Sequence, residues 1–231
     1  EPQSEAYNRL NLDGMRLSPQ KLAAVRASMT EEENLLSYLF PLLRYHSRWN
    51  ELKGEDLRYL THRDIVSDSG YLMNVQVRPA ENVPAGRPLG DYSFAPICWD
   101  YLDKMAGLCE EKGVRLVLIK APSLYPFWYD QWEEQIEDYA ARRGLSYINF
   151  LELTDEIGVD FTTDTYDSGL HLNLYGAEKL SRWFGQWLTA NCPVEDRRGQ
   201  EEYADIWNEK SAAYAARRER LEAEWSGENP A

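Results

Sequence analysis

The chain has 231 residues, which favours a single domain, and its 43% hydrophobic and 13% aromatic content is typical of a folded globular protein. Its formal net charge is −14 and it has no basic run, so we expect neither nucleic acid nor an anionic membrane surface as a partner. The longest apolar run, LLSYLFPLL at 35–43, is too short to cross a bilayer. We therefore expect no membrane insertion by these residues.

The sequence contains none of the common metal or phosphate motifs. It has no HExxH, no close pair of histidines and no Cys–His cluster, and it lacks both GxxxxGK[ST] and GxGxxG. We therefore expect neither a metal nor a cofactor. An odd number of cysteines without CxxC excludes a disulfide-dense scaffold and predicts free thiols at Cys98, Cys109 and Cys192.

Residues 1–65 predict a helical segment. Ser18 followed by Pro19 is a typical helix start, and Thr30 with Glu33 has the pattern of a capping box for a second helix. Residues 66–96 are rich in Pro, Gly and Asn and predict a long connection. Within it, YLMNVQV at 71–77 is a candidate edge strand.

Residues 97–192 predict alternating helices and strands. VRLVLI at 114–119 predicts a strand buried on both faces, and LSYINF at 145–150 predicts a second strand. A helix that ends at Gly144 separates them, and another begins near Asn173. The order predicts a parallel sheet with right-handed crossovers. An earlier helix, which ends at Gly113, has one apolar face that consists of Ile97, Tyr101, Met105, Leu108 and Cys109.

Two strands are too few for a doubly wound sheet, whose buried centre needs about four or five. We therefore expect this chain to be the later part of an α/β fold whose earlier strands lie upstream of Glu1 or come from another chain. The first residue is Glu and not Met, as expected of a processed or cropped sequence. Residues 193–231 predict a charged helix strapped across the body of the protein, with a partner-binding helix as the alternative.

A histidine with acidic neighbours marks the segment TDTYDSGLHLNLYGAEKL at 163–180. His171 follows a loop that contains Gly and precedes a helix, and such loops line the active crevice of parallel α/β sheets. Asp167 is spaced to accept the Nδ1 proton of His171, which would leave Nε2 to take a proton from a serine. An ordinary surface loop with the same spacing is the alternative.

The stretch DSGLHLNLYGAEKL at 167–180 resembles the C-terminal signature of the SGNH (GDSL-type) hydrolase superfamily. GVRLVLIKAPSLYP at 113–126, with GLSYINF at 144–150, is similar to the strand–helix–strand unit that precedes this signature. The resemblance implies a three-layer, flavodoxin-like α/β fold with a parallel sheet, incomplete here on its N-terminal side. It also implies that His171 is the catalytic base and Asp167 the acid. The family spacing is one residue shorter, which makes Asp164 the other candidate acid.

The nucleophilic serine of that family lies on its first strand, in a block that has no match here in the right order. We therefore expect the nucleophile upstream of this chain. The internal alternatives are Ser67 and Ser69 in VSDSGY, and Ser123, which lies with Lys120 at the carboxyl end of a predicted strand.

Five residues are candidates for binding substrate: Ser123, Lys120, Asn173, His46 and Arg48. Arg48 suits a carboxylate or phosphate group, although YHSRW at 45–49 also fits a surface helix end. The aromatic stretch YPFWYDQW at 125–132 is either a platform for sugar rings or part of the helix packing.

The resemblance, which is to the bacterial cell-surface branch of the superfamily, implies a serine esterase or O-acyltransferase. Its substrate would be an acylated polysaccharide or another small ester, and it would lie outside the cytoplasm, anchored by an upstream segment. The alternative is a non-catalytic glycan-binding or assembly module that keeps the fold. A third hypothesis is a cytoplasmic esterase of the same superfamily.

Overall fold

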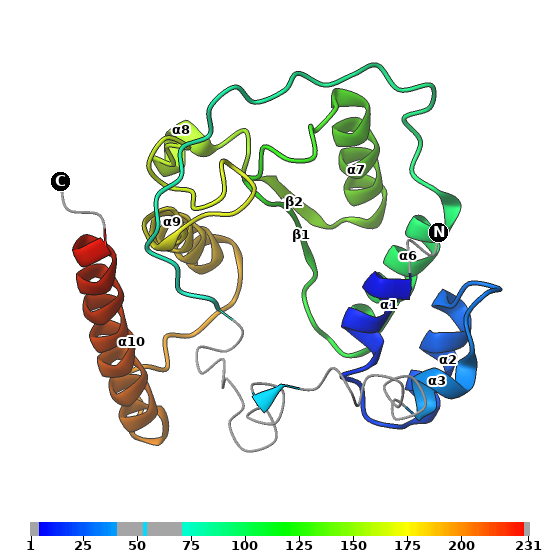
Figure 1. Ribbon diagram of the computed structural model, residues 1–231, viewed down its shortest axis with the longest axis horizontal. Coiled ribbons are helices and arrows are strands. Elements are labelled where there is room, and N and C mark those ends of the chain that lie inside the picture. Colours follow the sequence, from blue (N-terminus) through cyan, green and yellow to red (C-terminus); the bar gives the residue numbers. More distant parts are fainter. Residues whose placement is uncertain (1–4, 41–52, 55–70, 229–231) are drawn as a thin grey trace. The chain divides into compact units, whose positions relative to one another are not determined.

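The computed structural model describes residues 5–40, 53–54 and 71–228 (Figure 1). The chain forms two units, each with its own internal packing. The first consists of Glu1–Ile65 with Ala95–Ile97, and the second of Val66–Phe94 with Cys98–Ala231. The candidate residues that the structure describes all belong to the second unit.

The described part of the first unit contains α1 (Glu5–Leu12), α2 (Pro19–Ser28) and α3 (Leu35–Leu39). The hydroxyl of Ser18 accepts a hydrogen bond from the Lys21 N–H at 3.1 Å, which confirms the predicted helix start. The prediction that Thr30 caps the next helix is wrong, because Asn34 is the N-cap of α3. Glu33 accepts the N–H of Thr30 at 2.6 Å, but this bond closes the turn before the helix.

A small apolar cluster holds these three helices together. It consists of Leu12, Val25 and Tyr38, and both Val25 and Tyr38 are fully buried. The guanidinium of Arg9 lies 3.6 Å from the centre of the Tyr38 ring, so the cluster is closed on one side by a cation–π contact.

The second unit contains two parallel strands, β1 (Val117–Lys120) and β2 (Ser146–Asn149), paired in register from Val117 with Ser146 to Lys120 with Asn149. Helix α7 (Asp130–Arg143) connects them, and Gly144 ends it with a left-handed φ of 64° that suits glycine. The predicted strand–helix–strand unit is therefore present (Figure 1). The described residues form a mixed helical structure with this small parallel sheet, consistent with an α/β fold.

The core of this unit lies where α9 (Leu174–Asn191) packs against β2 and the chain that follows it. Four residues near β2 and the short helix α8 (Thr154–Ile157) are buried: Ile148, Phe150, Ile157 and Val159. The side chains from α9 that pack on them are Leu180, Trp183, Phe184 and Trp187. The spacing of these four residues places them on one helix face, as an amphipathic helix requires.

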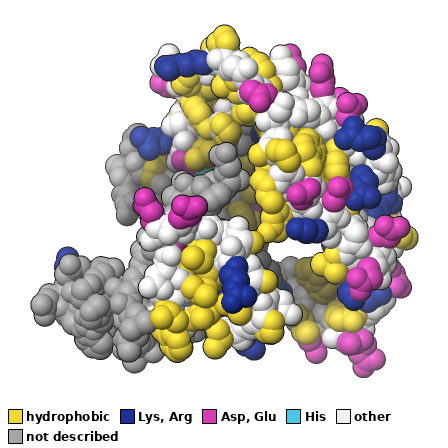
Figure 2. Space-filling view, turned by 90° about the vertical axis from the view of Figure 1, so that its right-hand side faces the viewer, with side chains coloured by type: hydrophobic (Ala, Val, Ile, Leu, Met, Phe, Trp, Pro, Cys, Tyr) yellow, Lys and Arg dark blue, Asp and Glu magenta, His cyan; other side chains and the backbone are white. Residues whose placement is uncertain are grey.

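The predicted burial of both faces of β1 is wrong, and helix α6 (Pro96–Glu111) lies mostly at the surface. Helix α6 exists and Gly113 follows its end, but α6 has no buried residue. Its predicted apolar face is exposed, with Met105 at 51% and Leu108 at 55%, and Ile119 on β1 is 53% exposed. Hydrophobic side chains are visible at the surface in Figure 2. No described element covers these residues, and burial of an apolar face requires a packing partner.

The described part of the connection, 71–94, contains no helix and no regular strand. The candidate edge strand 71–77 is extended but joins neither β1 nor β2. Its backbone and that of the next residues instead bond to the chain around His171: Leu174 N–H to Asn74 O at 2.7 Å, and Arg78 N–H to Thr165 O at 2.8 Å. This segment therefore supports the loop that carries the candidate site.

Helix α10 (Glu201–Glu228) confirms the predicted C-terminal helix. Its second half packs on α9 and on the extended segment through an apolar cluster: Tyr71, Met73, Val75, Leu174, Tyr175, Tyr214, Leu221 and Trp225. Arg218 adds a two-pronged ion pair with Glu178 of α9, at 2.8 and 3.0 Å. In its first half, Trp207 remains 47% exposed.

Candidate functional site

The loop between α8 and α9 is closed by a buried threonine. Thr165 and Leu172 form an isolated antiparallel bridge, so the residues between them make a tight loop. The Thr165 hydroxyl accepts the N–H of Gly169 and donates to the carbonyl oxygen of His171, both at 2.8 Å. Because Thr165 is fully buried, this hydroxyl fixes the loop from inside.

Asp167 and His171 are in direct contact at the surface of this loop. The Asp167 carboxylate lies 2.6 Å from Nδ1 of His171 and accepts the backbone N–H of His171 at 2.7 Å. The Asp167 side chain is 25% exposed and the His171 side chain 60%. With Nδ1 held by the carboxylate, Nε2 is the ring nitrogen left for another group, which is the arrangement of an acid–base pair.

The electrostatics of Asp167 favour its ionised form. Partial burial by itself raises the pKa of this carboxyl group, but the hydrogen bonds from the ring and backbone of His171 outweigh that effect. The net result is a pKa of Asp167 below its ordinary value. A carboxylate that stays ionised is suited to stabilise an imidazolium.

A tyrosine ring covers part of the His171 imidazole. The two rings are parallel to within 8°, and the Tyr166 and His171 ring centres are 5.7 Å apart. Burial, followed by the nearby charge of Asp167, raises the pKa of the Tyr166 hydroxyl, so this group stays protonated at neutral pH. The imidazole is thus bounded by a carboxylate at Nδ1 and by an aromatic ring against its plane.

Asp164, the other candidate acid, makes different contacts. Its side chain is 2% exposed and forms an ion pair with Lys179 of α9 at 2.6 Å. The same carboxylate oxygen accepts the backbone N–H of Asp160 at 2.8 Å. These contacts tie the start of the loop to α9, and the carboxylate that bonds His171 is that of Asp167.

Asn173 has all of its side-chain hydrogen-bonding groups inside the fold. It is the N-cap of α9, and its Oδ1 accepts N–H groups of the first helical turn at 3.1 and 3.2 Å. Its Nδ2 donates to Gln76 O at 3.1 Å and to Thr163 O at 2.8 Å. Because Asn173 is 1% exposed, its side chain supports the loop from inside the fold.

The chain that leaves β1 lies against the His171 loop. The Leu124 N–H donates to Gly169 O at 2.8 Å, one residue after Ser123. Gly169 has a φ of +103°, and a Cβ at this position would lie 2.7 Å from a Leu124 methyl group. Glycine is therefore required both by the backbone conformation and by this close approach.

The side chains of Ser123 and Lys120 are engaged by their own turn. The Ser123 hydroxyl donates to Tyr125 O at 2.6 Å, and the Lys120 ammonium donates to Ala121 O at 2.6 Å and to Ser123 O at 3.2 Å. Burial lowers the pKa of Lys120, against the opposing charge of Glu133. Both residues lie near the loop of the candidate pair, but their polar atoms bond to local backbone.

The aromatic stretch at 125–132 packs mainly against other aromatic rings. Tyr129 lies 4.7 Å from Trp132 and 4.9 Å from Phe127, measured between ring centres. The Trp128 indole N–H donates to the buried carboxylate of Glu133 at 2.6 Å. These contacts favour the packing interpretation of the stretch over a free sugar platform.

Several predictions concern residues outside the described part of the chain, namely His46, Arg48, Ser67 and Ser69. Within 5–40, 53–54 and 71–228, no group of three or more His, Cys, Asp or Glu side chains is placed to hold a metal ion. In the same residues, no helix has the length and apolar content needed to span a membrane. The three cysteines are free thiols, and Cys98 is exposed.

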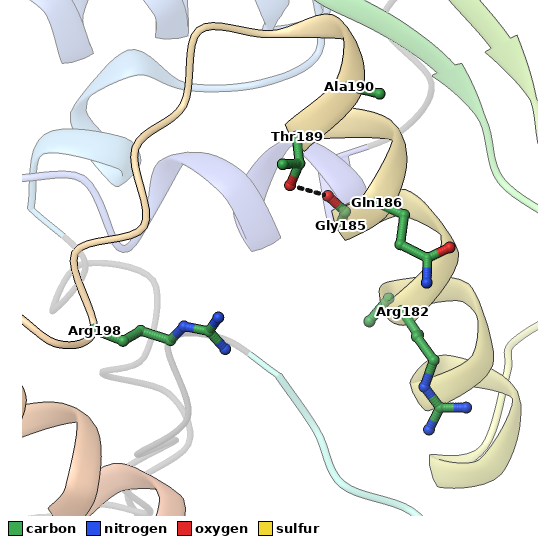
Figure 3. Close-up of a pocket in the computed structure, with 7 residues that line it drawn as sticks. Arg182, Gly185, Gln186, Thr189, Ala190 and Arg198 are labelled. Carbon is green, nitrogen blue, oxygen red and sulfur yellow. Dashed lines mark hydrogen bonds between the residues drawn. The ribbon is translucent and has the colours of Figure 1, made fainter.

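A shallow hollow of about 660 Å³ lies beside α9, and His171 is not among the residues that line it (Figure 3). Arg182 and Gln186 project from the helix, and Arg198 reaches from the following loop. The Arg198 guanidinium already binds both carboxylate oxygens of Asp196, at 2.9 and 2.7 Å. The residues that line the hollow include two arginines and no Asp, Glu or His.

Comparison of the chain with protein-family models, with curated proteins and with solved structures gave no match. The functional argument therefore depends on the residues and their geometry.

Three contributors to the site escape sequence reasoning. Thr165 and Tyr166 are ordinary loop residues whose contacts appear only when the loop closes. Lys179 lies 15 positions after its partner Asp164. The only sequence signal is indirect, since Lys179 follows Asn173 by six positions and so belongs to the first turns of the predicted helix.

Proposed function

We propose that this chain is the acid–base part of an SGNH-type serine esterase or O-acyltransferase. The observation that carries the proposal is the 2.6 Å contact between Asp167 and Nδ1 of the exposed His171. The substrate would be an acyl ester on a polysaccharide or another small ester. We further propose a location outside the bacterial cytoplasm, with anchoring by another part of the protein.

In this mechanism His171 acts first as a general base and then as a general acid. Nε2 takes the proton of a serine hydroxyl while the oxygen attacks the ester carbonyl, and then returns the proton to the leaving alcohol. Asp167 keeps the imidazole in the tautomer with a proton on Nδ1 and stabilises the imidazolium. Water as acceptor gives an esterase, and a sugar hydroxyl gives an O-acyltransferase.

The nucleophilic serine, in this proposal, belongs to strands that complete the sheet. Support comes from the exposed apolar face of α6 and from Ile119 on β1, which is 53% exposed. A parallel strand rich in β-branched residues is normally covered on both faces. Further strands and a helix beside β1 would cover these residues and complete a three-layer sheet.

One observation favours the alternative, a non-catalytic glycan-binding or assembly module. Ser123 lies near the His171 loop, but its hydroxyl donates to the carbonyl of Tyr125 at 2.6 Å and not to His171. A protein with the same loop but no nucleophile would bind an acylated glycan without turning it over.

The test is hydrolysis of p-nitrophenyl acetate and of acetylated glycans by this chain and by the full-length polypeptide that contains it. His171→Ala should abolish the activity, while His62→Ala serves as the matched histidine control. Activity that is confined to the longer protein and lost in His171→Ala supports the proposal. Equal rates with and without His171 in both proteins would rule out the enzyme and leave the binding module.

A further inference from the structure

Tyr166 lies between the two residues that define the loop geometry. On one side Thr165 is fully buried and bonds to His171 O, and on the other side Asp167 bonds to the His171 ring. The backbone of Tyr166 is therefore held at both ends. Its ring reaches the His171 imidazole and lies parallel to it, within 8° and with ring centres 5.7 Å apart.

The ring of Tyr166, and not its hydroxyl, is the part that contacts His171. No hydrogen bond is formed by this hydroxyl within the described residues. Offset parallel rings at this separation attract each other, so the stack restricts rotation of the imidazole. The restriction matters because the His171 side chain is 60% exposed and has few other neighbours to hold it.

We propose that Tyr166 is a positioning residue, which holds the imidazole of His171 in the plane that leaves Nε2 open to the nucleophile. The effect of Tyr166 on catalysis rests on the proposed function, whereas its ring contact with His171 does not depend on that proposal. Asp167 fixes one edge of the imidazole and Tyr166 fixes its plane. Two restraints of different direction define a ring orientation that neither gives alone.

The contact is tested by NMR of the ring protons of His171 in this chain. The chain has three histidines, so a His171→Gln variant assigns the resonances. Tyr166→Phe should leave the His171 ring-proton shifts close to those of the wild type, because the ring is kept. Tyr166→Leu should move them, because the ring current is lost. Tyr101→Leu, an exposed tyrosine of α6, is the matched control and should have no effect.

Two outcomes decide the inference. Shifts that move in Tyr166→Leu, and not in Tyr166→Phe or Tyr101→Leu, support it, provided the amide spectrum shows that the variant is folded. His171 shifts that are the same in Tyr166→Leu and in the wild type overturn it.

The kinetic arm uses the full-length protein and tests the proposed function separately. Tyr166→Leu should lower kcat by about fivefold with little change in KM, and Tyr166→Phe should restore it. If KM rises while kcat is kept, Tyr166 contacts substrate and the positioning inference fails. If the NMR shifts behave as expected but no variant of His171 affects turnover, the proposed function fails while the orienting contact stands.

Discussion

Asp164 and Asp167 belong to the same loop, and we predict that neutralising each of them affects a different property of the protein. The perturbation is Asp164→Asn in one variant and Asp167→Asn in the other. Each change keeps the side-chain volume and removes one charge. The buried Asp164 should govern stability, while the partly exposed Asp167 should govern turnover.

The expected cost for Asp164 follows from its contacts. Its carboxylate accepts the Lys179 ammonium at 2.6 Å, the Asp160 N–H at 2.8 Å and the Thr163 hydroxyl at 3.3 Å, and it is 2% exposed. Loss of a charge-assisted bond, with an amide N–H facing another donor, costs about 2–4 kcal/mol. Lys179 is 38% exposed and regains water, which keeps the cost at the lower end of the range for broken buried pairs.

The expected cost for Asp167 is smaller. Its side chain is 25% exposed and its partner 60%, so the pair contributes about 0–1 kcal/mol to stability. Its effect on turnover should be large, because a neutral amide favours the wrong tautomer of the imidazole. The equivalent change in Ser-His-Asp proteases lowers kcat about 10⁴-fold.

The assay combines thermal unfolding, followed by circular dichroism, with ester hydrolysis by the full-length protein. Asp164→Asn should lower Tm by about 5–10 °C, and Asp167→Asn by no more than about 3 °C. Hydrolysis should fall sharply only in Asp167→Asn when both are measured well below their Tm. If the two variants melt together, or if Asp164→Asn alone loses turnover, the assignment of these carboxylates is refuted.

The remaining predictions concern pH, a glycine and the C-terminal helix. The folded state lowers the pKa of the Asp167 carboxyl group, so its ionised form stabilises the fold at pH values above the ordinary Asp pKa. This stabilisation is lost as the pH falls through the lowered pKa. NMR of the side-chain carboxyl carbon should show that Asp167 titrates below the ordinary pKa of 3.8. Gly169→Ala should cost about 1–3 kcal/mol because of its φ of +103°, whereas Gly185→Ala on the exposed side of α9 should be neutral or stabilising in the same chemical denaturation assay. Arg218→Ala removes the ion pair with Glu178 and should speed hydrogen exchange in α10, and unchanged exchange would show that the apolar contacts alone hold it.

Helix boundaries with a local signal are predictable from this sequence. Ser18 before Pro19 starts a helix, and Gly144 ends one with a left-handed φ, because cap chemistry involves only neighbouring residues. The start of α3 is misjudged because Thr30 and Glu33 form the same bond in a simple turn. A capping pattern predicts a hydrogen bond more securely than it predicts the helix after it.

Burial and the support of the site are less predictable, because both depend on distant parts of the chain. The apolar face of α6 and β1 residue Ile119 are exposed, although their patterns favour burial. In the loop, Asp167 and His171 are only four positions apart, so their contact can be predicted from local sequence spacing. The hydrogen bond from Arg78 N–H to Thr165 O comes from a segment more than 80 residues earlier in the same chain, and no local sequence pattern indicates it.

The placement of Asn173 has a consequence for the chemical ageing of the protein. Deamidation would replace its Nδ2 donor by a second oxygen, facing the carbonyl oxygens of Gln76 and Thr163 at 3.1 and 2.8 Å. That reaction begins with attack by the backbone nitrogen of the next residue on the side-chain amide. Here the N–H of Leu174 is bonded to Asn74 O at 2.7 Å, and both Asn173 and Leu174 are buried. The fold thus protects from succinimide formation an amide that joins three stretches of its backbone.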